Sequence, residues 1–170
     1  MDTVTLRPWS EGDFPLLQRA NTPAMTAHLN GPESDELVAD RHERYLRLGA
    51  EGVAHTFVIL EGGQPVGSIA YWDVEWRDRP AYETGWFVLP EAQGRGLASV
   101  ALGLVIADAR ARGGERRLLT ACPGADNAAS NGVCRRNGFT LVGETSGEFR
   151  DAPFTMNEWV LDLDAETPDA

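Results

Sequence analysis

Lysine is absent from this chain of 170 residues, and all fifteen of its basic residues are arginine. A nucleotide-binding P-loop requires a lysine followed by serine or threonine after its second glycine, so this class of phosphate site is excluded. Cysteine is also scarce, because Cys122 and Cys134 stand without another Cys or His at metal-ligand spacing. We therefore expect two reduced thiols, no disulfide framework and no metal.

Long hydrophobic runs are missing as well. The longest mostly apolar segment, from Leu97 to Ala109, is interrupted by polar residues and is too short to cross a bilayer. The start of the chain carries Asp2 and has no basic stretch ahead of an apolar one, so it does not resemble a signal peptide. These observations predict no membrane partner and a cytoplasmic location.

The chain also lacks an excess of positive charge, because its net charge is −11. Phosphate backbones attract basic patches, so we expect no nucleic-acid partner. Between Gly94 and Phe139, however, seven arginines stand against three acids, a local balance of +4 that leaves −15 for the remainder. This asymmetry predicts an anionic cofactor on the basic part and a cationic amine on the acidic part, although acidic surface also serves solubility alone.

With 42% apolar residues the chain is predicted to be one globular domain over residues 1–170, with 164–170 as a frayed tail. Apolar alternation and turn residues predict strands at 4–7, 54–60, 65–73, 82–90, 117–122, 139–142 and 155–163. Helical periodicity and caps predict helices at 10–20, 35–50, 97–111 and 127–136. This order indicates an α+β fold around a mixed, mostly antiparallel sheet.

The most informative segment is the turn Gln93-Gly94-Arg95-Gly96-Leu97-Ala98, which joins a predicted strand to a predicted helix. Free backbone N–H groups and the positive end of a helix dipole make such a turn a seat for phosphate. The dinucleotide fingerprint requires a third glycine where this chain has Ser99, so a dinucleotide is disfavoured. The turn therefore predicts another phosphorylated cofactor.

This turn resembles the acyl-CoA motif of the GNAT superfamily of N-acetyltransferases, Gln/Arg-x-x-Gly-x-Gly/Ala. The segment from Asn127 to Phe139 resembles a second GNAT pattern, Asn-x-x-Ser/Ala-x-x-hydrophobic-x-x-Lys/Arg-x-Gly-Phe. The triplet Glu83-Thr84-Gly85 resembles the branch that contains the ribosomal-protein N-terminal (alanine/serine) acetyltransferases and their small-molecule relatives. The resemblance implies the GNAT fold, with about six to seven strands and about four helices in three α/β/α layers.

It also implies acetyl-CoA as co-substrate and assigns residues to it. The backbone from Gly94 to Ser99 is expected to cradle the pyrophosphate, and Asn127 to bind the pantetheine arm. Backbone groups of Phe87, Val88 and Leu89 are expected to pair with pantetheine as an added strand would. The full cofactor set is Phe87, Val88, Leu89, Gln93, Gly94, Arg95, Gly96, Leu97, Ala98, Ser99, Asn127 and Arg135.

For catalysis, the resemblance makes Glu83 the candidate base, although it could instead be a structural carboxylate. Many family members place a tyrosine where this chain has Cys134, and cysteine is a weak donor. We expect Cys134 to be part of the core and Ser130 to support the leaving thiolate, unless its hydroxyl merely caps the helix. Plausible residues around the acceptor, not assigned individually, are His28, Asn30, Tyr71, Trp72, Asp73 and Trp76.

The resulting hypothesis is an acetyl-CoA-dependent N-acetyltransferase that acts on a protein N-terminus or a small amine by direct attack in a ternary complex. Two alternatives stay open: a different acyl-CoA donor, or a CoA-binding module without catalytic activity. A nucleotide-phosphate binder of another fold is disfavoured by the absent lysine and by the second motif. The sequence leaves the oligomeric state open, with a homodimer as one option, because dimers are common among such relatives.

Overall fold

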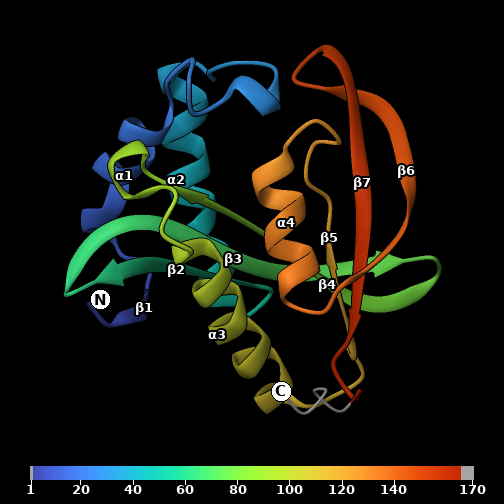
Figure 1. Cartoon of the computed structure of the whole chain (residues 1–170). Helices are drawn as coiled ribbons and strands as arrows, with labels where there is room; N and C mark the ends of the chain where they lie inside the picture. The colour runs from blue at the N-terminus through green and yellow to red at the C-terminus, as the bar shows by residue number, and fades with distance from the viewer. Residues whose placement is uncertain (1, 166–170) are drawn as a thin grey trace.

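The computed structural model describes residues 2–165 and contains a seven-stranded sheet in the order β1-β2-β3-β4-β5-β7-β6 (Figure 1). Neighbouring strands are antiparallel except for β4 and β5, which are parallel. The strands are β1 (Val4–Pro8), β2 (Ala54–Glu61), β3 (Gln64–Trp76), β4 (Arg79–Val88), β5 (Leu118–Ala121), β6 (Thr140–Phe149) and β7 (Ala152–Asp162). The predicted α+β fold with a mixed, mostly antiparallel sheet is confirmed.

Helices begin where the sequence offers caps. Ser10 and Asp13 form the predicted capping box ahead of α1, and the Ser34 hydroxyl accepts the Leu37 N–H at 3.2 Å at the start of α2. The α-helices are α1 (Phe14–Ala20), α2 (Asp35–Glu51), α3 (Leu97–Arg112) and α4 (Ala128–Arg136). The 3-10 turns are η1 (Glu11–Asp13), η2 (Ala27–Leu29) and η3 (Pro90–Ala92). No helix in the described range 2–165 is long and apolar enough to cross a membrane.

Two hydrophobic clusters cover the two faces of the sheet. One joins buried residues of α3 and α4, such as Leu102 and Val133, to Ile69 and Leu119 of the strands. The other joins α1 and α2 to the opposite side of β2 and β4. Figure 1 shows α3 and α4 on one side of the sheet and α1 and α2 on the other, so the predicted three layers are confirmed.

The main errors of the predicted elements concern β6 and its neighbours. β6 extends to Phe149 and β7 begins at Ala152, so the last hairpin is much longer than the two strands predicted there. β6 is an edge strand whose residues are nearly all exposed on both faces. Its sequence therefore lacks the apolar alternation that identifies a strand with one buried face. Of the predicted tail, residues 166–170 lie outside the described part of the chain.

Candidate active site

The parallel strands β4 and β5 stay together over only three rungs, which end at Thr84 and Ala121. Beyond them, β4 continues to Val88 against β3, while the chain after β5 turns to follow β7. The N–H of Asn157 donates to the Pro123 carbonyl at 2.9 Å and marks this turn. Within the described residues, the edge of β4 from Gly85 to Val88 is thus left without a strand partner on the β5 side.

The register of β4 decides which backbone groups point into this open edge. The Leu89 N–H donates to the Val66 carbonyl of β3 at 2.8 Å, so Leu89, and by antiparallel alternation Phe87, face β3. Val88 and Trp86 point the other way, and the Val88 carbonyl accepts the Gln93 amide at 2.8 Å. Of the three residues expected to pair with pantetheine, only Val88 directs its backbone groups to the open edge, and Trp86 does so as well, because successive backbone groups alternate in direction.

The glycine-rich turn follows directly on this edge. Gly94 and Gly96 have φ angles of 78° and 76°, which side-chain-bearing residues rarely adopt. Gly96 is the N-cap of α3 and supplies no capping side chain. The first turn-closing bond of α3 runs from the Val100 N–H to the Gly96 carbonyl at 3.2 Å, so the N–H groups of Leu97, Ala98 and Ser99 have no acceptor within the helix. These free N–H groups lie where the sequence predicts an anion seat.

The polar side chains around the turn have protein partners in this structure. Arg95 donates to Glu61 through one terminal nitrogen at 2.7 Å, and about half of its side chain is exposed. The hydroxyl and the carbonyl of Ser99 accept the Asn137 amide at 3.1 and 3.3 Å, which ties the end of α4 to the start of α3. Arg135 lies in the last turn of α4, with its guanidinium 5.5 Å from the centroid of the Trp159 ring.

The start of α4 carries the second motif. The Asn127 side-chain oxygen accepts the Ser130 N–H at 3.1 Å and caps the helix, so this bond does not use the Asn127 amide nitrogen. Because Asn127 is the cap, the Ser130 hydroxyl is not needed for capping.

Sequence reasoning missed Asn131, which is nearly fully buried at the centre of a polar network. Its amide nitrogen donates to the carbonyls of Gly124 and Asn127, and its oxygen accepts from Asn157 at 2.9 Å and from the Trp159 indole at 2.8 Å. These bonds fix α4 and the loop before it against β7. A second asparagine four positions after Asn127 was the available signal.

Glu83 lies on β4 at the last rungs before the strands separate, on the face opposite α3. The Cys122 thiol, at the end of β5, donates to this carboxylate at a sulfur–oxygen distance of 3.7 Å. Burial raises the pKa of Glu83, and the thiol bond partly opposes that rise. A raised pKa makes the carboxylate a stronger proton acceptor than an exposed glutamate, which suits a general base.

Neither cysteine is suited to be a nucleophile. Burial and the charge of Glu83 raise the pKa of Cys122 to about 12, so it remains a thiol. Cys134 is fully buried in the cluster under α3 and α4, and burial likewise raises its pKa to about 12. Cys134 belongs to the core, as expected.

The plausible acceptor residues separate into two groups. Trp72 is the direct cross-strand partner of Glu83 and covers Gly85, so it borders the site. Tyr71, one residue away, points to the opposite face, is fully buried, and bonds through its hydroxyl to Asp108 and Arg112. Including Tyr71 was wrong, because alternation along β3 sends neighbouring side chains to opposite faces.

His28 and Asn30 lie in the loop between α1 and α2 and border a cavity of about 280 Å³. The remaining walls come from the loop before α4 and from the start of β7. His28 Nδ1 lies 3.1 Å from an oxygen of Asp126, which bridges the first two walls. The residues lining the cavity are Ala27, His28, Asn30, Ala125, Asp126, Pro153, Phe154 and Thr155. Within residues 2–165, no three His, Cys, Asp or Glu side chains cluster in a way that could hold a metal ion.

Comparison with known proteins decides the family. The acetyltransferase (GNAT) domain family matches residues 3–140 of this chain, which include the open edge of β4, the glycine-rich turn and the start of α4. The chain belongs to the GNAT acetyltransferase family. Its resemblance to that family, and the fold that the resemblance implies, are thereby confirmed.

Two relatives are ribosomal-protein N-terminal acetyltransferases, the branch that the triplet Glu83-Thr84-Gly85 resembles. The ribosomal-protein-serine acetyltransferase of Escherichia coli (strain K12) is 32% identical over 118 residues, which cover 68% of this chain and 65% of that protein. The chain thus matches about two thirds of this relative's length. The ribosomal L7/L12 α-N-protein acetyltransferase RimL in complex with coenzyme A is 26% identical, with a TM-score of 0.81 and 96% of both chains covered.

A third relative is the acetyltransferase from Salmonella typhimurium that modifies the N-terminal serine of ribosomal protein L7/L12. Its structure is 26% identical to this chain, with a TM-score of 0.80 and with 95% of this chain and 96% of that one covered. Spermidine N-acetyltransferase from Vibrio cholerae, at 16% identity and a TM-score of 0.77, shares the fold alone. Members of one fold thus act on different amines, and the fold does not name the acceptor.

Proposed function

We propose that this chain is an acetyl-CoA-dependent N-acetyltransferase that acetylates a primary amine, with a protein N-terminal α-amine as the favoured acceptor. One observation carries the proposal: the open edge of β4 joins the uncapped start of α3 to Glu83. The donor is long, and this path accommodates its pyrophosphate at one end and its thioester at the other. The relatives named for ribosomal-protein N-termini favour the α-amine over a polyamine.

In the proposed reaction the acceptor nitrogen attacks the thioester carbonyl carbon. A new C–N bond forms, the C–S bond breaks, and the products are an amide and the CoA thiolate, which takes up a proton from the solvent. Glu83, directly or through water, takes the proton that the amine releases, and Ser130 donates a hydrogen bond to the departing sulfur. A base matters most for an aliphatic amine, whose pKa near 10 leaves about 99.9% of it protonated at neutral pH.

The backbone supplies the donor site in this proposal. The N–H groups of Leu97, Ala98 and Ser99 bind the pyrophosphate together with the N-terminal end of the α3 dipole. The backbone of Val88 and Trp86 and the amide of Asn127 hold the pantetheine arm. We further propose that the protein works in the cytoplasm and binds neither nucleic acid nor a metal; a homodimer and a preference for acetyl over other acyl donors remain predictions.

A matched pair of glycine variants tests the donor site. Gly96 and Gly52 share the same backbone conformation, with φ of 76° and ψ of 13° and 14°, and no atom lies within 4 Å of a Cβ placed on either one. Gly96→Val and Gly52→Val should therefore lose similar stability, of about 1–2 kcal/mol or more. Only Gly96→Val should weaken CoA binding, by about tenfold or more, in calorimetric titration.

Activity is measured by release of the CoA thiol from acetyl-CoA with a peptide N-terminus or a small primary amine. The proposal expects amine-dependent release by the wild type and loss of release in Gly96→Val at donor concentrations that saturate the wild type. Equal CoA affinity in the two glycine variants would reject the donor site. CoA binding without transfer to any amine would leave the chain a binding module.

A further inference from the structure

Two hairpins of this sheet turn on the same dipeptide, and their geometries nearly coincide. Arg77-Asp78 joins β3 to β4 with φ angles of 50° and 63°, and Arg150-Asp151 joins β6 to β7 with 52° and 62°. Two-residue turns of this kind favour Asn and Gly, because both positions have positive φ. The turn geometry alone therefore does not explain why arginine stands at the first position of both turns. The explanation has to come from the contacts that each arginine side chain makes.

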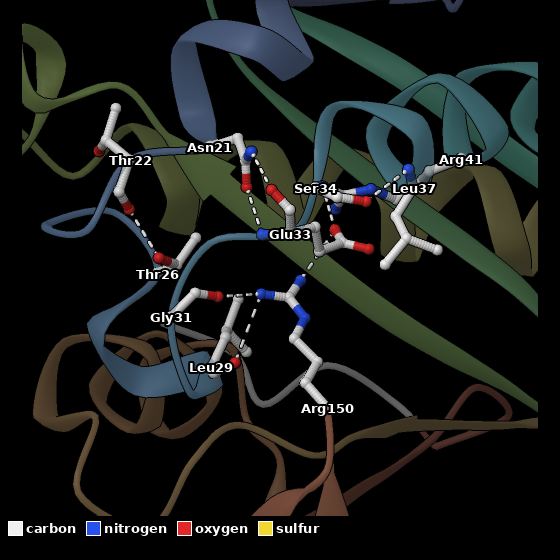
Figure 2. A network of polar contacts seen from close by, with 10 residues as sticks. All are labelled: Asn21, Thr22, Thr26, Leu29, Gly31, Glu33, Ser34, Leu37, Arg41 and Arg150. Atoms are coloured by element: carbon white, nitrogen blue, oxygen red, sulfur yellow. Dashed lines mark hydrogen bonds and ion pairs between the residues drawn. The ribbon is translucent and has the colours of Figure 1, made fainter.

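The two arginines differ in what they reach. Arg77 is 57% exposed, lies over the ring of its neighbour Trp76 at 4.6 Å from the centroid, and makes a long contact of 3.3 Å to Glu158. Arg150 is only 19% exposed and donates to the Gly31 carbonyl at 2.6 Å and to Glu33 at 3.0 Å. Figure 2 shows the Arg150 side chain reaching from its hairpin into the loop between α1 and α2. Arg150 thus fastens a segment more than a hundred residues away in the sequence.

Asn30 makes the reciprocal connection from the other side. Its amide nitrogen donates to the Phe149 carbonyl at 2.7 Å and lies 3.3 Å from the carbonyls of Ala152 and Pro153. The loop is held internally as well, since the Asn21 side chain and the Glu33 backbone exchange two hydrogen bonds of 2.8 and 2.9 Å. We call the contacts of Asn30 and Arg150 between residues 29–33 and residues 149–153 the clasp.

The acidic residue of the clasp, Glu33, pairs with two arginines. One oxygen of Glu33 serves two guanidiniums, Arg41 at 2.6 Å and Arg150 at 3.0 Å, and all three side chains are largely buried. If Arg150 is removed, Glu33 keeps Arg41 and the charges balance. If Glu33 is removed, both buried guanidiniums lose the one carboxylate that they contact among residues 2–165, which is far more costly. Arg150 is therefore the member that can be changed with the least damage to the fold.

The clasp lies beside the cavity next to the catalytic elements. Asn30 and Pro153 both belong to the clasp and to the cavity wall, and Asp126 in that wall immediately precedes Asn127 of the donor site. We propose, on the basis of the function proposed above, that Arg150 is a positioning residue for the acceptor. It holds residues 29–33 at the distance from the β6–β7 hairpin that acceptor binding requires, and it has no part in donor binding.

Arg150→Gln tests this, with Arg77→Gln as the matched control in the equivalent turn. Arg150→Gln should raise the KM for the acceptor about fivefold or more, while the KM for acetyl-CoA and kcat change less than about twofold. Arg150→Lys should recover part of the loss, because lysine restores the charge opposite Glu33 but cannot also reach the Gly31 carbonyl. Arg77→Gln should leave all three constants unchanged.

Hydrogen exchange separates positioning from general destabilisation. In Arg150→Gln, exchange should increase at residues 26–33 and not in α3 or β3. An unchanged acceptor KM would overturn the proposal, as would equal changes in both KM values and kcat together with a lower Tm. Failure of the proposed function is a different result, namely no acetyl transfer by the wild type. In that case hydrogen exchange in Arg150→Gln still tests whether the clasp holds residues 26–33 in place. Unaltered exchange at these residues would overturn the proposed role of Arg150.

Discussion

The Cys122 thiol donates to the Glu83 carboxylate over 3.7 Å, at the point where β4 and β5 separate. This contact joins the two strands on the face of the sheet opposite α3. It leaves Glu83 with one weak donor among the described residues, so the partly buried carboxylate lacks strong compensation. Burial accordingly raises the pKa of Glu83, and a rate that depends on its basic form must reflect that rise.

Glu83→Gln should lower kcat by about 100-fold at neutral pH with an aliphatic amine. In the wild type, kcat should fall as the pH drops through an inflection above the ordinary glutamate value of about 4.3, since the base must be deprotonated. A raised native pKa favours the protonated folded state, so the carboxylate costs stability once the pH exceeds it. Glu83→Gln should therefore have an equal or higher Tm at pH 7.

Glu144→Gln, on the exposed strand β6, is the control for loss of a carboxylate and should leave kcat and Tm unchanged. Cys122→Ala should move the inflection of kcat to higher pH, because the thiol bond lowers the pKa of Glu83. If Glu83→Gln turned over as fast as the wild type at saturating donor, Glu83 would not be the base.

Ser130 and Cys134 should respond to truncation in opposite ways. Ser130→Ala removes the hydroxyl assigned to the departing sulfur and should lower kcat about tenfold or more, with little change in Tm because Asn127 caps the helix. Cys134→Ala removes a fully buried side chain and should cost about 1–2 kcal/mol of stability without affecting kcat. Turnover and thermal unfolding of both variants check this, and the reverse pattern would make Cys134 the thiolate donor.

Gly67→Ala should be among the more damaging small substitutions. A Cβ at position 67 would lie 2.2 Å from the Phe87 carbonyl oxygen, a backbone atom that cannot move without shifting β4. We expect a loss of about 2–4 kcal/mol in the free energy of unfolding, measured by denaturant titration. Gly143→Ala in β6, where a Cβ meets nothing within 4 Å, is the control and should change stability far less.

The local signals of the sequence were most reliable where a short segment fulfils its own requirements. Ser10 with Asp13 and Ser34 with Leu37 make caps within one turn, and both helix starts were predicted. The strand, glycine turn and helix around Gln93 to Ala98 need no distant partner either. The geometry of this turn was therefore predictable before any fold was known.

The sequence did not predict features that depend on contacts with residues distant in the chain. Alternation along β3 shows that Tyr71 and Trp72 point to opposite faces, but not which face holds the site. The exposed edge strand β6 has no buried face to give it a pattern, so most of its length was missed. Asn131 and Arg150 look like ordinary polar residues in the sequence, and their roles come from Trp159 and Gly31, which the fold brings to them.

By itself, the sequence determined the order of the elements, the family motifs and the anion seat at the start of α3, because each depends on neighbours within a few residues. Only the tertiary structure decided that β4 and β5 separate after three rungs, that Glu83 and Cys122 meet there, and that Val88 rather than Leu89 faces the opening. These features depend on strand register, which is set by contacts between segments distant in the chain.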